Sequence, residues 1–252
     1  MTPDTKVGPS ACSRDCRRCS RRVAILGQVR DAFLGHHGAP VPPFGDPAAR
    51  LLLVGLAPGM HGANATGRPF RGDHAGIIPD DILYRFGFAS GRESGSADEG
   101  LRLPDCRITN AVECLPPQNE PSPSEVQTCN PYLATELGGL PPGALVLALG
   151  ALAHAAVLKA IRLASAAFPF AHGAEHGITP RLRLLVSCHR SRYNTLTRRL
   201  TQPMFHAIFA SAKPVLPEGR DGPIPLQAGS GIGTTGPEDL RCCLQQCFLK
   251  NL

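Results

Sequence analysis

The stretch Leu51–Asp73, LLLVGLAPGMHGANATGRPFRGD, decides the fold of this chain. It opens with four apolar residues and Gly55, which is the length and composition of a strand buried on both faces. Residues 57–64 follow as a loop with two glycines and one proline, where a tight turn is expected. The far end carries two cations, an aromatic ring and a carboxylate: Arg68, Arg71, Phe70 and Asp73. Ligands of open α/β sheets bind just past the strand ends, so this loop is a candidate nucleotide site.

The same order of buried strand, loop and helix recurs along the chain. Further strands are expected at residues 107–112, 145–150 and 182–187, and helices at residues 23–34, 77–88, 124–137, 151–163 and 201–212. Ser122 and Glu125 form a capping-box pattern at the start of the third of these helices. The recurrence predicts an α/β fold with a parallel sheet that is covered by helices on both faces.

Polar residues stand at the carboxyl ends of several of these strands. Asn110 lies near the end of the second strand, and His189 and Asn194 follow the fourth. The carboxyl ends of parallel strands share one edge, so these side chains are expected to meet Asp73 there. Singly, each Asn or His is as well explained by surface or capping duty, but together they indicate a site.

The ends of the chain differ from its middle in composition. We expect residues 1–11 to be disordered, residues 12–212 to form the domain, and the Pro- and Gly-rich residues 213–252 to be a flexible extension. No stretch approaches the ~20 apolar residues of a membrane span, and the N-terminus lacks an apolar signal-peptide core. The pattern predicts a cytosolic protein that has no membrane partner.

Charge and cysteine content add two hypotheses about partners. With 26 Lys+Arg against 20 Asp+Glu the net charge is +6, which fits either a polyanionic partner or a GC-rich genome. Ten cysteines in a cytosolic chain favour metal ligands or spare thiols over disulfides. Cys16 and Cys19 form a Cys-x2-Cys pair, and Cys114 and Cys129 complete a four-thiolate set for structural zinc or an iron-sulfur cluster. Alternatively, Cys114 or Cys129 is a small buried hydrophobe.

Three motifs together resemble one family. GLAPGMHGANATGRPFRGD, RITNAVECLPPQNEP and CHRSRYNTLTRRLT are similar to those of the family 5, or type B, uracil-DNA glycosylases, from about Cys16 to Phe209. The resemblance implies a three-layer α/β/α fold around a four-stranded parallel sheet. It also implies a [4Fe-4S] cluster on Cys16, Cys19, Cys114 and Cys129, and a monomer that excises uracil, and other deaminated bases such as hypoxanthine and xanthine, from DNA.

The resemblance also implies a role for each candidate site residue. Phe70 matches the aromatic ring on which the flipped base stacks, Asn110 the amide that reads the base edge, and Gly59 a position that contacts the substrate. Asp73 matches the carboxylate that stabilises the sugar cation or orients water, while His189 would donate to the departing base and Asn194 would hold the flanking DNA. Ala57 stands where other uracil glycosylases carry a polar catalytic residue, which moves that role toward Asp73.

Two readings from other classes stay open. A zinc-stabilised nucleic-acid-binding module would keep the cysteines and arginines but would not need Asp73, Asn110 and His189 at one edge. A superfamily member that binds damaged DNA without catalysis would keep all of them. A Rossmann or Walker nucleotide enzyme is disfavoured, because neither of the corresponding glycine motifs follows the first strand.

Overall fold

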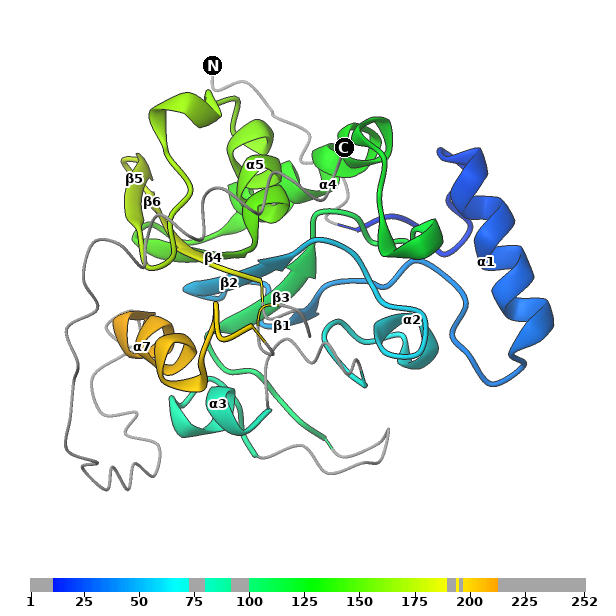
Figure 1. Cartoon of the computed structure of the whole chain (residues 1–252), viewed down its shortest axis with the longest axis horizontal. Coiled ribbons are helices and arrows are strands. Elements are labelled where there is room, and N and C mark those ends of the chain that lie inside the picture. Colours follow the sequence, from blue (N-terminus) through cyan, green and yellow to red (C-terminus); the bar gives the residue numbers. More distant parts are fainter. Residues whose placement is uncertain (1–10, 73–79, 92–99, 190–193, 195–196, 213–252) are drawn as a thin grey trace, which may run out of the picture.

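A six-stranded sheet lies at the centre of the molecule (Figure 1). The structure is a computed structural model, and it describes residues 11–72, 80–91, 100–189, 194 and 197–212. The strands are β1 (Phe44–Gly45), β2 (Leu51–Gly55), β3 (Cys106–Asn110), β4 (Ala144–Leu149), β5 (Glu175–Thr179) and β6 (Leu182–Ser187). They lie in the order β1-β3-β2-β4-β6-β5. The four inner strands are parallel, and β1 and β5 pair antiparallel at the two edges.

Helices cover both faces of the sheet. They are α1 (Ser20–Ala32), α2 (Ala63–Thr66), α3 (Asp80–Arg85), α4 (Pro123–Gly139), α5 (Ala151–Ala160) and α7 (Gln202–Ala212). In Figure 1, α4 and α5 lie on one side of the sheet and α3 and α7 on the other. None of the helices within the described residues combines the length and apolar character needed to cross a membrane. The predicted α/β/α sandwich around four parallel strands is therefore confirmed.

The apolar run that opens the first motif separates two hydrophobic cores. Leu51 and Leu53 of β2 pack into the core beneath α3 and α7, whereas Leu52 and Val54 pack into the core beneath α4 and α5. Every residue of β2 is buried. A strand that is covered on both faces has no polar side to alternate with, which explains why its sequence is continuously apolar.

Strand register aligns the carboxyl ends at one edge of the sheet. Gly55 of β2 stands directly opposite Asn110 of β3, and Leu149 of β4 stands opposite Ser187 of β6. The pairing continues past β3, because Ala111 N donates to the Gly55 carbonyl at 2.8 Å. We call this edge, where the loops after β2, β3, β4 and β6 begin, the carboxyl rim.

The sequence-based boundaries differ from the structure in a few places. The edge strands β1 and β5 were not predicted, because one has two residues and the other, EHGIT, is largely solvent-accessible and lacks an apolar run. The helix expected to reach Phe88 ends at Arg85, and Gly87 follows in a left-handed conformation (φ 79°) that closes it. The expected flexible extension, residues 213–252, lies outside the described residues.

Candidate active site and cysteine pocket

Phe70 and Asn110 meet over a glycine at the carboxyl rim. A Cβ atom added to Gly55 would lie 2.5 Å from Phe70 Cζ and 2.6 Å from Asn110 Oδ1. Both distances are far shorter than van der Waals contact, so only glycine fits at the end of β2. An aromatic ring and an amide, 9% and 5% exposed, thus converge on the same point at the rim. Such a pair can stack on one face of a planar heterocycle and read its polar edge.

The backbone of Phe70 is strained. Its φ is 62°, in the left-handed region that non-glycine residues rarely adopt. The loop that carries it is fastened at its start, where Asn64 N donates to the Gly59 carbonyl at 2.9 Å. Strain of this kind persists where surrounding structure enforces it and is common at ligand sites. Gly59, the predicted substrate contact, is partly buried and anchors this loop by accepting the hydrogen bond from Asn64 N.

His189 occupies another part of the rim, after β6. A Cβ atom added to Gly150, at the end of β4, would lie 3.1 Å from His189 Cβ. Burial lowers the pKa of His189, so its ring is neutral at pH 7. The Asn194 amide donates to the His189 carbonyl at 2.6 Å, which fixes the start of this loop. About 14 Å, three strand spacings, separates β3 from β6, and the ends of β2 and β4 lie between Asn110 and His189.

His172 supports this second part of the rim. Its Nδ1 accepts a hydrogen bond from Cys188 N at 3.2 Å and lies 3.4 Å from Ser187 Oγ. Burial lowers the pKa of His172, which keeps Nδ1 free to accept. His172 thereby holds the backbone that leads into His189. The remaining predicted site residue, Asp73, lies outside the described residues.

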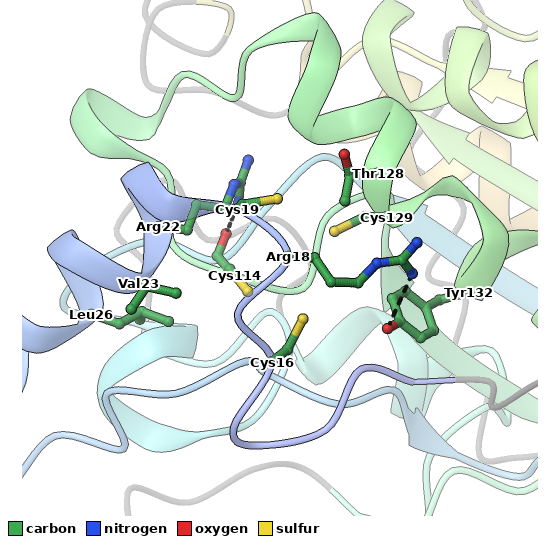
Figure 2. Close-up of a pocket in the computed structure, with 10 residues that line it drawn as sticks. All are labelled: Cys16, Arg18, Cys19, Arg22, Val23, Leu26, Cys114, Thr128, Cys129 and Tyr132. Carbon is green, nitrogen blue, oxygen red and sulfur yellow. Dashed lines mark hydrogen bonds between the residues drawn. The ribbon is translucent and has the colours of Figure 1, made fainter.

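Four cysteines from distant parts of the chain line one pocket. Figure 2 shows the sulfurs of Cys16, Cys19, Cys114 and Cys129 turned toward a common space between the N-terminal loop and α4. Cys129 lies on α4, which begins with the predicted capping box of Ser122 and Glu125. No three His, Cys, Asp or Glu side chains among the described residues gather closely enough for one metal ion. The predicted four-thiol set is thus assembled around a shared space.

The surroundings of the thiols favour a cationic guest. Burial raises the pKa of Cys129 to about 12 and also raises that of Cys19, while the neighbouring Cys12 side chain lowers the pKa of Cys114. Thiolates enclosed in this way need positive charge beside them. Arg18 and Arg22 lie in the pocket wall and supply part of it.

Arg22 holds the pocket together. It is 1% exposed, donates through Nη1 to the Cys114 carbonyl, and pairs through Nη2 with Glu125 Oε2 at 3.2 Å. The N-terminal helix, the loop after β3 and α4 therefore meet on one guanidinium. Within the described part of the chain its buried Nε has no hydrogen-bond partner. A donor left over in the pocket wall suits a guest that carries acceptor sulfur atoms.

Comparison with known proteins shows which family the chain belongs to. The sequence profile of the uracil DNA glycosylase superfamily matches residues 42–213. The type-5 uracil-DNA glycosylase of Thermus thermophilus is 45% identical over 204 residues, which cover 79% of this chain and 92% of the relative. The chain belongs to the type-5 uracil-DNA glycosylases.

Other relatives place the chain within the superfamily. The type-5 uracil-DNA glycosylase of Pyrobaculum aerophilum is 41% identical over 74% of this chain and 83% of the relative. A type-4 uracil-DNA glycosylase of Archaeoglobus fulgidus is 36% identical, but over only 42% of this chain and 46% of the relative. The type-5 matches thus extend over most of the chain, whereas the type-4 match is partial.

Sequence reasoning missed two supporting residues of this type-5 glycosylase. Arg22 stands in a run of arginines, and only its helical phase with Leu26 and Val29, both buried, marks it as different from Arg21. His172 precedes β5 in a glycine-containing loop where no pattern distinguishes it from a surface histidine. Cys12, which the predicted ligand set leaves out, donates its thiol to Glu113 Oε2 at 3.3 Å beside Cys114.

Proposed function

We propose that this protein excises uracil from DNA by hydrolysing its N-glycosidic bond and leaving an abasic site. The observation that carries the proposal is the convergence of Phe70 and Asn110 on Gly55 at the carboxyl rim. A base reaches such an enclosed pair only after rotation out of the helix, which costs a few kcal/mol and least where pairing is already weakened. The names of the type-5 relatives support the same activity.

Asn110 and Phe70 would recognise the flipped base. The Phe70 ring offers a stacking face, and the side-chain amide of Asn110 offers one acceptor and a donor pair to the edge of uracil. Both side chains are buried, so binding of the base would require little further ordering of either. We assign substrate binding to these two residues, with Gly59 holding the loop.

The chemical step needs charge stabilisation on both sides of the breaking bond. When the bond between C1′ and N1 breaks, its electron pair leaves with the base, and the sugar is left with positive charge. Asp73 would stabilise that charge and orient the water whose oxygen adds to C1′, while the water's proton ends on the base. The neutral ring of His189 would donate a hydrogen bond to the developing base anion, with Asn194 positioning the His189 loop.

Larger deaminated bases fit the same proposal. Ala57 stands in the loop after β2 where other uracil glycosylases carry a polar residue, and its short side chain would leave room for a larger base. Hypoxanthine and xanthine present a carbonyl and an N–H along the edge that Asn110 would read. We therefore propose that the enzyme also removes these bases, and that it acts as a monomer on DNA in the cytoplasm, associated with the nucleoid.

End-labelled duplexes that carry uracil, hypoxanthine or xanthine test the activity. Wild type, Asp73→Ala and His189→Ala are purified without oxygen. Each protein is incubated in excess with the duplexes, and alkali then cleaves the strand at any abasic site. We expect excision by wild type, a large loss in Asp73→Ala, and retained binding of the duplex by both variants. If wild type binds the lesions and leaves every base in place, the protein is a non-catalytic binder of damaged DNA.

We also propose that the cysteine pocket holds a [4Fe-4S] cluster on Cys16, Cys19, Cys114 and Cys129. The four thiols surround a shared space without three of them gathering around one point, which suits a multi-iron cluster better than zinc. The leftover Nε donor of Arg22 suits the inorganic sulfides of such a cluster. When bound, the cluster would cross-link the N-terminal loop, the loop after β3 and α4, and no catalytic step is assigned to it.

Metal analysis separates the cluster from zinc. Protein purified without oxygen is assayed for iron, acid-labile sulfide and zinc. About four iron and four sulfide per chain are expected, and Cys129→Ser should lower both. One zinc per chain with no sulfide would instead establish the structural-zinc alternative.

A further inference from the structure

Two apolar side chains protrude where α1 ends. Phe33 is 37% exposed and Leu34 is 95% exposed, although both follow a helix that packs against the cysteine pocket. Phe33 stacks on His36, with ring centroids 4.6 Å apart and planes at 12°. The exposed His61 meets both rings edge-on, at 5.5 Å from Phe33 and 5.8 Å from His36. Three rings thus form a single aromatic patch, and the exposed Leu34 follows Phe33 directly in the chain.

This aromatic patch is attached to the active-site loop. His61 itself belongs to the loop after β2, two residues beyond Gly59. The segment that carries His36 is hydrogen-bonded to α2 of the same loop, through His37 N to the Ala65 carbonyl at 2.9 Å and Gly38 N to the Asn64 carbonyl at 3.3 Å. The end of α1 and α2 accordingly lie on the same side of the molecule (Figure 1). The patch is therefore continuous with the loop that carries Phe70.

A cation stands beside the patch. Arg30, in the last turn of α1, donates through Nη1 to the Gly38 carbonyl at 2.7 Å, which holds its guanidinium next to the segment of His36. Exposed π faces beside a guanidinium are the chemistry that binds single-stranded nucleic acid, where bases stack and phosphates pair with cations. A protein partner would be served by apolar area alone and would gain little from a stacked pair of rings with a third ring edge-on to both.

We propose that Phe33, Leu34, His36 and His61 form a stacking surface for an unpaired base of the substrate strand, next to the nucleotide that is flipped into the rim. Phe33 and the imidazoles would supply the stacking faces, and Leu34 would insert as an apolar wedge against a neighbouring base. The proposal rests on the proposed action on DNA. It names a second, sequence-tolerant contact, since every base has a π face, and this contact favours substrates in which flanking bases are already unstacked.

A tryptophan at position 33 reports on this surface directly. The chain contains no tryptophan, so Phe33→Trp creates a single fluorophore within the patch. The variant is titrated with a single-stranded oligonucleotide that carries a 2′-fluorinated deoxyuridine resistant to excision, and binding of the same oligonucleotide, end-labelled, is followed by anisotropy. We expect quenching of the tryptophan that saturates together with the anisotropy. Phe168→Trp, half-buried near the opposite edge strand β5, is the matched control and should not respond.

Affinity measurements complete the test. Phe33→Leu, which keeps the apolar character without the ring, should weaken binding of the single strand by about tenfold, and Phe33→Tyr should restore it. DNA binding without quenching in Phe33→Trp, or equal affinities of the Leu and Tyr variants, would overturn the proposal. If tryptophan emission changes with protein concentration alone and sedimentation shows dimers, the patch is a contact between two copies of this chain and the proposal is wrong. Failure of the proposed activity can be told apart from failure of this proposal, because quenching reports DNA binding at the patch whether or not wild type excises uracil.

Discussion

The carboxyl rim and the cysteine pocket are both assembled from distant segments, but different forces hold them. At the rim, backbone hydrogen bonds of the sheet place Gly55 opposite Asn110 and Leu149 opposite Ser187. In the pocket, single side chains hold separate segments together, above all Arg22, which joins the Cys114 carbonyl to a carboxylate of α4. Many equivalent bonds support the rim, whereas few side chains support the pocket.

Because of this difference, substitutions in the two regions should affect excision and folding to different extents. A substitution at the rim removes a group that would touch the substrate and leaves the sheet register intact, so excision should suffer more than folding. A substitution in the pocket removes one of the few side chains that join its segments, so folding should suffer more than excision. A rim variant that mainly loses stability, or a pocket variant that mainly loses excision, would contradict these assignments.

The largest expected effect is at Asn110. Asn110→Leu removes the amide that would bind the base, and we expect excision in excess enzyme to fall by about 10²–10³-fold. The thermal midpoint should change little, because a side chain that is 5% exposed is replaced by an apolar one of similar size. Asn130→Leu is the matched control: Asn130 is also buried, but it donates to the Ala156 carbonyl between α4 and α5. It should lower the midpoint and leave excision unchanged, and the opposite pattern would count against these assignments.

The next effect is on stability, at Arg22. Arg22→Met leaves the buried Glu125 without one of its cationic partners and the Cys114 carbonyl without its donor, at a cost of about 3–5 kcal/mol. Thermal unfolding followed by circular dichroism should show a midpoint lower by roughly 10 °C. Arg21→Met removes the other partner of Glu125, but the Arg21 side chain is 49% exposed, so solvent screens this ion pair and the midpoint should fall much less. Equal losses in the midpoint for the two variants would show that burial does not decide how much each arginine stabilises the fold.

The smallest expected effect is on the pH dependence of stability. It tests the rim, because the His172 side chain supports the backbone that leads into His189. Burial lowers the pKa of His172 below the value of about 6.5 in the unfolded chain. As pH falls through about 6.5 the unfolded chain takes up the proton first, so stability that is fully present above this pH is lost below it, by at most about 1.4 kcal/mol per pH unit. Urea unfolding between about pH 5 and 8 should show a shallower loss in His172→Met than in wild type. Identical slopes would contradict this role of His172.

The parts that could be predicted from the sequence are those with a periodic or positional signal. The run Leu51–Gly55 predicts a strand buried on both faces, and the rule that parallel strands share a carboxyl edge predicts that the loop after β2 and Asn110 belong to one site. The Ser122 and Glu125 pattern predicts the start of α4 within a residue. In these cases local sequence and fold depend on the same hydrogen bonds and burial.

The remaining features depend on contacts that no local pattern encodes. Gly55 ends its strand as many glycines do, and only the positions of Phe70 and Asn110 show that a Cβ atom cannot fit. Neither the burial of Arg22 nor the aromatic patch around Phe33 follows from its neighbours in sequence, because α4 and the loop after β2 complete them. Long-range packing creates these sites, so they emerge only from the structure.

Uracil excision by Gly55→Ala, compared with Gly177→Ala, tests the central claim most directly. Both glycines lie in strands, but an added Cβ atom clashes with Phe70 and Asn110 at position 55 and meets nothing within 4 Å at position 177. If the rim recognises the base, Gly55→Ala should fold and excise uracil about 10²-fold more slowly, because displacing the recognising groups by about 1 Å has that effect, while Gly177→Ala should match wild type. A folded Gly55→Ala that excises uracil at the wild-type rate would contradict the assignment of the rim as the active site.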